Sequence, residues 1–205
     1  MDSPRASPML PDRRQISCTI TFLLVLIGVR CVMALDIDDL RITKQGRAYQ
    51  VQMTFGVTAS VNQVIAVLTD YEFPDRLDPE VTKREVISRH GKITRVRTEI
   101  RGCVFIFCKD IAFTLDVTVV EDNIQADIVP DESDFRSGYF HWSVSSSGNG
   151  GSQIVFESVM EPDFFIPPLI GGIFVRKMLR QKILATVENL ESEAAREPAR
   201  VMNRN

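Results

Sequence analysis

The feature that most constrains this chain is a long series of alternating segments that ends in one amphipathic helical pattern. Alternation is clearest between Ile111 and Val119, where every second residue is a large apolar one, the period of a half-buried strand. The same period predicts strands over Thr82–Arg89, Ile93–Arg101, Asp110–Glu121, Ile124–Val129, Ser137–Ser145 and Gln153–Glu161. Turn residues such as His90-Gly91 and Asp122-Asn123 separate neighbouring segments. Short turns between successive strands predict an antiparallel meander.

Three further elements precede the meander. Over Tyr49–Val57 apolar residues again alternate with polar ones, which predicts a first strand. Ser60 followed by Gln63 is a capping-box pattern and predicts the start of a short helix. Pro74 and Pro79 then predict an irregular connection to the next strand.

The last element is a helix predicted from about Leu169 to Arg196. Its apolar residues recur at spacings of three and four, the pattern of one buried helical face. They are Val175, Leu179, Ile183, Val187, Leu190 and Ala194. An antiparallel sheet has one face to bury, and this helix is the only predicted element long enough to cover it. The sequence therefore predicts an α+β fold, with a curved antiparallel sheet of about six to seven strands wrapped around the C-terminal helix.

The N-terminal segment is expected to be an export signal rather than part of the domain. Arg13 and Arg14 precede an uncharged apolar run that is shorter than the roughly 20 residues a spanning helix needs. Val32-Met33-Ala34 then has the small-residue pattern of a cleavage site. We expect residues 1–34 to be removed, leaving a single domain over 35–205 in the periplasm of a Gram-negative bacterium or, otherwise, secreted. The alternative is an uncleaved membrane anchor.

Removal of this signal would leave two of the four cysteines, Cys103 and Cys108. Disulfides persist in exported compartments, but residues five apart in one straight strand are about 16 Å apart and cannot bond. If 93–101 and 110–121 are instead the arms of a hairpin, the two cysteines become cross-strand neighbours. The sequence therefore predicts a disulfide that closes this hairpin, and the alternative is two separate thiols.

Composition and motifs exclude several classes of function. The net charge of -3, from 24 Lys+Arg and 27 Asp+Glu, is unlike that of a nucleic-acid binder. The two histidines and the cysteine spacing give no metal site. The chain also lacks the G-x-S-x-G, H-E-x-x-H, Walker A and G-x-G-x-x-G motifs. We therefore expect no nucleic-acid partner, no metal, no cofactor and no catalytic constellation.

Several short motifs spread over about 47–193 are similar to those of one known family. They are Val57–Ser60 before the first helix, Asp70-Tyr71, Phe73-Pro74 and Leu77–Pro79 after it, Glu85–Ile87, Asp134-Phe135 through Trp142, and Met160–Phe164 before the last helix. With them the chain resembles the helix-grip fold of the START-like (SRPBCC) superfamily, in particular its polyketide cyclase and coenzyme-Q-binding branch. The resemblance implies a core over 47–193, followed by a frayed tail over 194–205. It also implies a cavity between sheet and helix that holds an apolar molecule.

The function implied by this resemblance is binding of a hydrophobic small molecule or lipid without covalent chemistry. A quinone, an acyl lipid or a polyketide-like ring would fit. One alternative is a polyketide cyclase or aromatase, which would need polar groups aimed into the cavity, and the alternation shows none. A second alternative is a protein-interaction module, whose cavity would be filled. Members of the superfamily differ in activity, so the fold alone does not select among these functions.

The expected binding residues follow from the implied cavity, because the same apolar side chains would line a cavity or fill a core. The expected lining is Phe113, Leu115, Trp142, Phe156, Phe174 and Met178. Two apolar loops beside basic residues of the last helix are expected to form a rim that makes transient contact with a membrane surface. The rim residues are Phe105, Ile106, Phe107, Phe164, Phe165, Arg176, Lys177 and Arg180. The alternative is that both loops fold inward and plug one end of the sheet.

Overall fold

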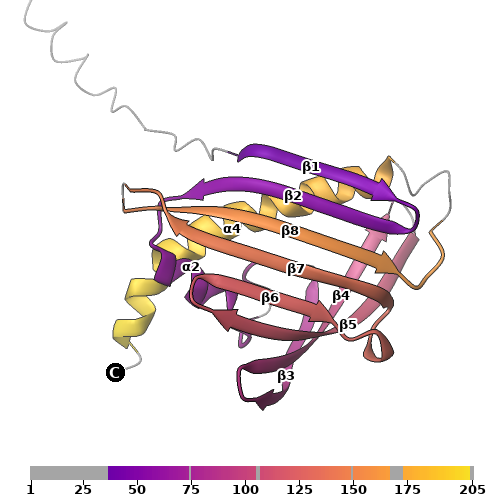
Figure 1. Cartoon of the computed structure of the whole chain (residues 1–205), viewed down its shortest axis with the longest axis horizontal. Helices are drawn as coiled ribbons and strands as arrows, with labels where there is room; N and C mark the ends of the chain where they lie inside the picture. The colour runs from indigo at the N-terminus through magenta and orange to yellow at the C-terminus, as the bar shows by residue number, and fades with distance from the viewer. Residues whose placement is uncertain (1–36, 74, 105–106, 149, 167–172, 204–205) are drawn as a thin grey trace, which may run out of the picture. The chain divides into compact units, whose positions relative to one another are not determined.

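The architecture is an antiparallel sheet curled around one long helix (Figure 1). The structure, a computed structural model, describes residues 37–73, 75–104, 107–148, 150–166 and 173–203. The expected signal segment lies outside the described residues.

The sheet has eight strands, one or two more than the expected six to seven. They are β1 (Ile37–Gln45), β2 (Ala48–Val57), β3 (Val81–His90), β4 (Ile93–Val104), β5 (Phe107–Val120), β6 (Asn123–Ile128), β7 (Phe135–Ser146) and β8 (Ser152–Pro162). Their order across the sheet is β1-β2-β8-β7-β6-β5-β4-β3, and every neighbouring pair is antiparallel. The predicted meander is confirmed, and the additional strand is β1, which pairs with β2 at one edge.

Alternation along β2 decides which face of the sheet is buried. Its inward residues are all buried, namely Tyr49, Val51, Met53, Phe55 and Val57, whereas Gln52 between them is exposed. Phe55 lies opposite Ile154 of β8, and both side chains are fully buried. The concave face is therefore the apolar one, as the period of two requires.

Helix α2 (Val61–Leu68) begins where the sequence predicts. The backbone N–H of Ser60 donates to Oε1 of Gln63 at 2.8 Å, and the Ser60 carbonyl accepts the first helical hydrogen bond from Val64 at 3.0 Å. The contact of Gln63 with the Ser60 backbone is the half of a capping box that fixes where the helix starts. Val64 and Val67 are buried in the main core cluster.

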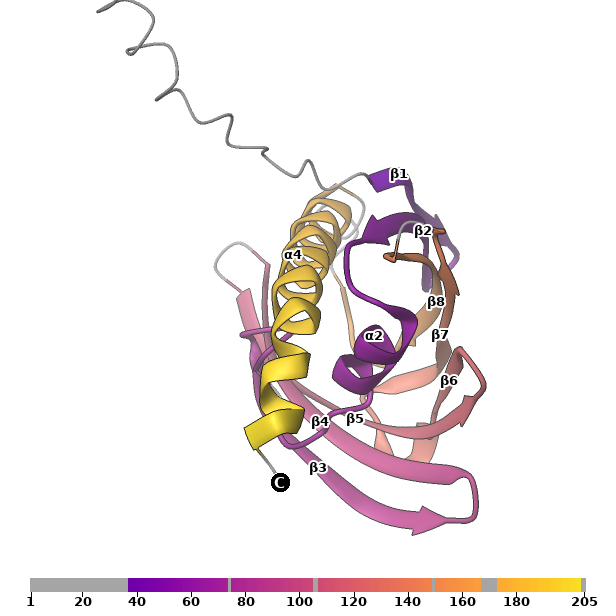
Figure 2. The ribbon, with the colours of Figure 1, turned by 90° about the vertical axis from the view of Figure 1, so that its left-hand side faces the viewer.

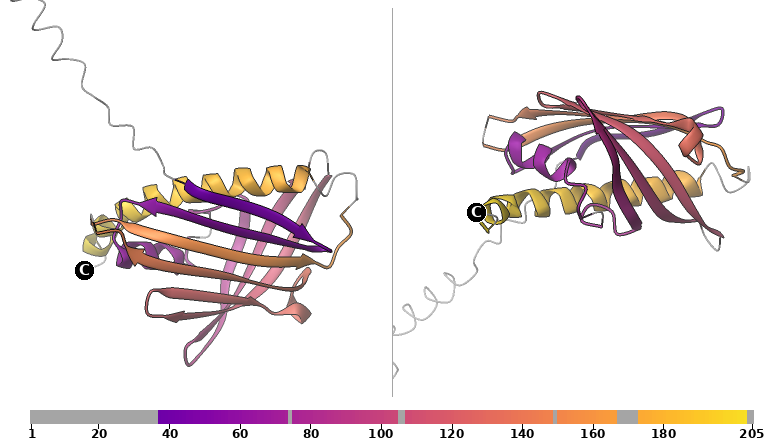
Figure 3. Two further views of the ribbon diagram at one scale, coloured as in Figure 1. Left: turned by 45° about the horizontal axis from the view of Figure 1, so that its top comes forward. Right: turned by 90° about the horizontal axis from the view of Figure 1, so that it is seen from below.

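Helix α4 (Phe174–Asn203) crosses the concave face of the sheet (Figures 2 and 3). Of the predicted apolar stripe, Val175, Val187, Leu190 and Ala194 are buried, and Leu179 and Ile183 are partly buried. The described helix continues past the expected end at Arg196. The expected start near Leu169 lies outside the described residues.

Charged contacts hold the connection between α2 and β3 against α4. Arg76 forms an ion pair with Asp70 and a second one, at 2.7 Å, with Glu193 of α4. The amide of Asn189 donates to the carbonyl of Leu77 at 3.1 Å. Because the Arg76 and Glu193 side chains are both nearly buried, loss of either one would leave a poorly solvated charge.

The filled part of the core lies where α2 sits between the sheet and the C-terminal half of α4 (Figure 2). There, Val64 and Val67 of α2 join Val187 and Leu190 of α4 in one cluster with the inward residues of β2 and β8. The N-terminal half of α4 has no such second helix beside it among the described elements. That half of the concave face is where the cavity described below lies.

Gly138 allows β7 and β8 to approach closely. Its φ is +154°, and a Cβ atom there would lie 2.3 Å from the carbonyl oxygen of Val159 and 2.8 Å from a methyl carbon of Ile128. A side chain at this position therefore meets both an unfavourable backbone conformation and the backbone of the neighbouring strand.

We expect Gly138→Ala to lower the free energy of unfolding by at least about 2 kcal/mol, measured by urea denaturation. The matched control is Gly56→Ala in β2, where the nearest atom to an added Cβ is 3.9 Å away, and we expect a change within about 0.5 kcal/mol. Equal stability of the two variants would contradict the close approach at Gly138.

Candidate functional site: an apolar cavity between sheet and helix

A cavity of about 590 Å³ lies between the concave face of the sheet and the N-terminal half of α4. Its wall is mostly apolar and comes from six strands, from α4 and from the connections before β3 and after β8. The lining residues are Tyr49, Asp78, Val81, Arg84, Thr98, Ile100, Gly102, Cys108, Lys109, Ile111, Phe113, Phe135, Phe140, Met160, Pro162, Phe164, Phe165, Ile166, Val175, Met178, Leu179 and Lys182. This volume lies within the usual range for pockets that hold small molecules.

Aromatic rings form one side of the cavity. Phe113 of β5 meets Phe135 edge-on, with ring centroids 5.8 Å apart, and stacks on Phe140 at 6.5 Å. Phe135 in turn meets Phe164, just after β8, at 6.1 Å. These contacts connect two strands, β5 and β7, and the loop after β8 into a continuous apolar wall.

Two polar side chains face the cavity from β3 and β4. Arg84 and Thr98 are directly opposite each other in the sheet, and Nε of Arg84 donates to the Thr98 hydroxyl at 3.4 Å. Burial lowers the pKa of the Arg84 guanidinium, while Tyr71 and Asp78 raise it by electrostatic attraction. Arg84 is therefore a cation in an environment that disfavours its charge.

A second polar group lies where α4 passes the connection before β3. Lys182 of α4 forms ion pairs with Asp78, at 3.5 Å, and with Glu80. The other carboxylate oxygen of Asp78 accepts the backbone N–H of Glu80 at 2.9 Å. Asp78 thus has both carboxylate oxygens engaged while its side chain lines the cavity.

Sequence alternation did not single out Arg84, because β3 contains a bulge and strict alternation cannot assign its two faces. Val81 lies opposite Ile100, but Lys83 lies opposite Glu99, so Thr82 is an extra residue. In a regular strand Lys83 would lie opposite Thr98, and the bulge instead places Arg84 there. Alternation counted from Val81 therefore assigns Arg84 to the outer face, whereas alternation counted from Val86 assigns it to the inner face. One signal was available: Val81 and Val86 are five residues apart, and both can face inward only if the strand is irregular.

The six expected lining residues are divided by the structure. Phe113 and Met178 line the cavity. Phe156 is buried in the main core, Trp142 packs beside it with ring centroids 4.2 Å apart, and Leu115 packs against the smaller core cluster. Phe174, at the start of α4, is 47% exposed and is not part of the wall. Whether any of the six contacts a ligand stays a prediction.

The predicted disulfide is present at one end of the cavity. Cys103 and Cys108 are bonded, with Cα atoms 4.0 Å apart, and they are paired across the β4–β5 hairpin. The chain therefore reverses between them, as the disulfide prediction required. Cys108 and the adjacent Lys109 line the cavity, so the hairpin end forms part of its mouth.

Of the expected rim, the described loop after β8 lies at this same end and has both an inward and an outward residue. Phe164 packs on Phe135, and the centre of its ring lies 4.3 Å from Nζ of Lys109. Phe165, in contrast, is 80% exposed. Arg176, Lys177 and Arg180 are exposed on α4. Phe105, Ile106 and the side chain of Phe107 lie outside the described residues. Phe164 thus faces inward and Phe165 faces outward, and whether this loop makes a membrane-contacting rim stays a prediction.

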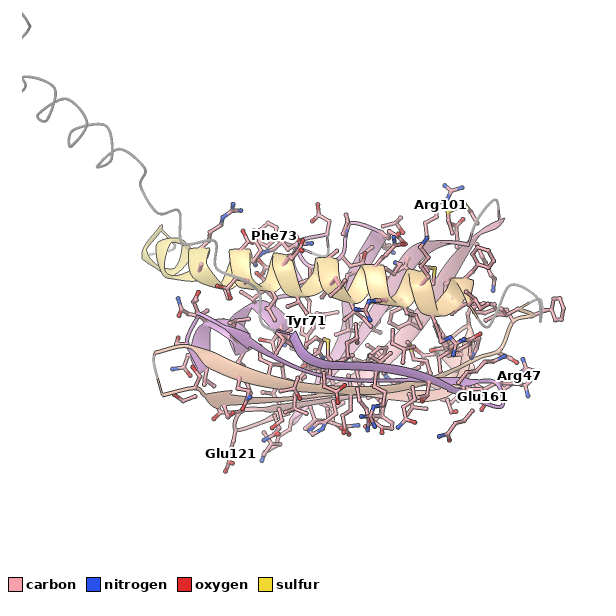
Figure 4. All side chains as sticks on the ribbon, turned by 90° about the horizontal axis from the view of Figure 1, so that it is seen from above. Arg47, Tyr71, Phe73, Arg101, Glu121 and Glu161 are labelled. Carbon is pink, nitrogen blue, oxygen red and sulfur yellow. A yellow bond between two sulfur atoms is a disulfide. The ribbon has the colours of Figure 1, made fainter. Side chains whose placement is uncertain are left out.

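A smaller pocket of about 260 Å³ adjoins the cavity at its mouth. It shares Tyr49 and residues 164–166 with the cavity, and adds Lys44 and Arg47 from the β1–β2 end. Figure 4 shows Arg47, Glu161 and Arg101 at this end of the domain and Glu121 at the opposite end. The mouth is therefore an apolar opening bordered by charges of both signs, because Asp163 also lines the smaller pocket and Arg47 pairs with Glu161.

The arrangement of the cavity suits binding and orientation of a ligand. In the described ranges no three His, Cys, Asp or Glu side chains cluster as a metal site would need. The apolar wall can exclude water from a ligand, and Arg84, Lys182 and Asp78 can orient its polar end. A curved antiparallel sheet closed by one helix over such a cavity defines a helix-grip domain.

The chain belongs to the polyketide cyclase / dehydrase and lipid transport family, whose model matches residues 48–195. Family and fold together indicate a START-type domain that binds hydrophobic ligands or acts as a polyketide cyclase. A comparison with curated proteins finds no match.

Solved structures of the START superfamily share the fold. The Zhui aromatase/cyclase from Streptomyces sp. R1128 is 15% identical, with a TM-score of 0.61 over 73% of this chain and 94% of that one. A STAR-related lipid transfer protein from Xanthomonas axonopodis is 13% identical, with a TM-score of 0.57 over 77% and 99% of the two chains. A START superfamily protein from Mycobacterium smegmatis is 18% identical, with a TM-score of 0.58 over 72% and 97%. At these identities the likeness shows the fold alone.

None of the helices in the described ranges is both long enough and apolar enough to cross a membrane.

Proposed function

We propose that this protein is an exported carrier that binds a hydrophobic small molecule or lipid between the sheet and α4, without covalent chemistry. The observation that carries the proposal is the cavity of about 590 Å³ with its continuous aromatic wall. Each Å² of apolar ligand surface removed from water contributes about 25 cal/mol, so most of the affinity would come from burial of the apolar part of the ligand. A quinone, an acyl chain or a polyketide-like ring meets this requirement.

A second candidate is a cyclase-type enzyme that uses the same cavity. It is favoured by Arg84, Asp78 and Lys182, because a cyclase needs polar groups in the wall to act on a folded chain of carbonyl groups. The relative that is named as an aromatase/cyclase shows that the fold can serve an enzyme. The third alternative, an interaction module, expects a filled cavity and gains no support from the open one.

The exposed apolar residues near the mouth, with exposed cations of α4 beside them, support a proposal of transient contact with an anionic membrane surface. Phe165, Ile173 and Phe174 are exposed apolar side chains, at 80%, 72% and 47%. Arg176 and Lys177 follow directly on α4 and are exposed. Apolar side chains that can enter the headgroup region, flanked by cations that attract anionic lipids, are the features of interfacial binding. A ligand could then pass between bilayer and cavity without crossing water.

Filling part of the cavity with a larger side chain should weaken ligand binding. We expect Met178→Trp to weaken binding of the neutral apolar dye Nile red at least about tenfold, because the larger side chain occupies ligand space. Dye fluorescence titration measures the affinity, and a thermal melt verifies folding. The matched control is Gln181→Trp on the same helix, at an exposed position outside the wall. If the unaltered protein binds no dye and shows no bound small molecule in native mass spectrometry, the proposed function is wrong.

Membrane contact should depend on the exposed apolar residues of the mouth. We expect the double change Phe165→Ser and Ile173→Ser to reduce co-sedimentation with vesicles of phosphatidylcholine and phosphatidylglycerol at least about threefold. Binding should also fall with added salt, because exposed charges are screened. Val120→Ser, an exposed apolar position at the opposite end of β5 from the hairpin tip, is the control. Equal vesicle binding by all three proteins would argue against docking through the mouth.

Export predicts a shortened N-terminus. We expect protein recovered from the periplasm or medium of its native host to begin at Leu35, measured by intact mass. A full-length N-terminus in the membrane fraction would instead support the anchor alternative.

A further inference from the structure

We propose that Arg84 is the head-group site of the cavity and that the ligand is a single-chain amphiphile whose anionic head group, a carboxylate or a phosphate, binds there. This inference rests on the proposed function, because it names the class of ligand that the same cavity would take.

The first support is the unused hydrogen-bonding capacity of Arg84. A guanidinium has five N–H donors, and within the described ranges the side chain donates one hydrogen bond, to Thr98 at 3.4 Å. No ion pair joins Arg84 to any described carboxylate. The remaining donors lie in the wall of the cavity. A carboxylate or phosphate accepts from such a fork with two parallel hydrogen bonds.

The nearby Asp78 does not fill this role. It attracts Arg84 electrostatically, but one of its carboxylate oxygens accepts the backbone N–H of Glu80 and the other pairs with Lys182. Glu80 also pairs with Lys182. Asp78 is therefore committed to the contact between α4 and the connection before β3, and an added anion at Arg84 completes a pairing that the protein leaves open.

The charges of the wall agree with an anionic ligand at Arg84. Of the three cationic side chains that line the cavity, Lys109 pairs with Asp134 and Lys182 pairs with Asp78 and Glu80, whereas Arg84 has no ion pair with a described carboxylate. In a cavity of low polarity an unbalanced cation attracts an anion more strongly than it would in water. The apolar remainder of the wall suits a hydrocarbon tail.

The register of the sheet gives the orientation of the ligand. The disulfide-bonded pair Cys103 and Cys108 lies at the mouth, and Gly102, Ile100 and Thr98 follow along β4 on the inward face, away from the mouth. The next inward residue, Val96, is buried in a packed core cluster. Arg84, opposite Thr98, therefore lies at the inner end of the cavity. The head group would bind deep, and the tail would extend past Phe113 toward the mouth.

The test compares three probes with the same tail: dodecanoate, dodecyl phosphate and the neutral methyl dodecanoate. Calorimetric or dye-displacement titrations give their affinities for the mature protein and for the Arg84→Gln and Arg84→Met variants, the second of which suits an apolar wall. We expect at least one of the two acids to bind the unaltered protein about tenfold or more tightly than the ester. Both variants should lose this preference while their affinity for the ester changes less than about threefold.

The control is Arg101→Gln, which removes an exposed arginine of β4 that pairs with Asp110 outside the cavity and should keep the preference. No preference in the unaltered protein would overturn the inference and show that water solvates Arg84. A preference that persists without Arg84 would also overturn the inference, because it would mean that another cation of the protein binds the head group. If the ester and Nile red also fail to bind, the proposed function itself fails, so the two failures are distinguishable.

Discussion

The structure depends on the difference between the large apolar face of the sheet and the narrow stripe of the one long helix that covers it. A strand of alternating residues buries one side, and eight such strands in one curled sheet present more surface than α4 can reach. Beside the C-terminal half of α4, α2 supplies Val64 and Val67 and the space is filled. Beside the N-terminal half no described helix supplies a second apolar surface, and a cavity remains. The proposed binding site is thus the part of the apolar interior that the protein's own side chains do not fill.

Most of the fold could be predicted from the sequence because its signals are local. Alternation of apolar and polar residues predicted the strands of the meander. Ser60 and Gln63 predicted the start of α2, and apolar residues at spacings of three and four predicted the buried face of α4. Strand β1 could not be predicted, since Leu40 and Ile42 are its only described apolar residues that pack on the core. Phe113 and Phe156 both face inward from alternating strands, but Phe113 lines the cavity and Phe156 is packed in the core. Which of the two occurs depends on whether side chains of distant elements pack against the ring, and the local sequence pattern does not contain that information.

The polar part of the candidate site was hidden for a different reason. Arg84 faces inward because one extra residue, Thr82, shifts the register of β3 by one position, and a shift of one exchanges the two faces of a strand. Lys182 and Asp78 meet across a distance of about a hundred residues in sequence. Sequence alternation thus predicts which apolar residues face inward, but it does not predict that the charged residues Arg84, Asp78 and Lys182 line the cavity. The proposed ligand chemistry rests on these charged residues.

The irregularity of β3 also affects how the molecule meets its neighbours. A sheet that does not close has two edges, here β1 and β3, and a regular edge strand is a template on which the strand of another molecule can form. The register of β3 shifts twice, after Val81 and after Val86, and Lys83 and Glu85 place charge along its outer face. An incoming strand would find its row of hydrogen-bonding partners interrupted. The bulge that turns an arginine toward the cavity thereby also makes the β3 edge a poor template for pairing with another strand.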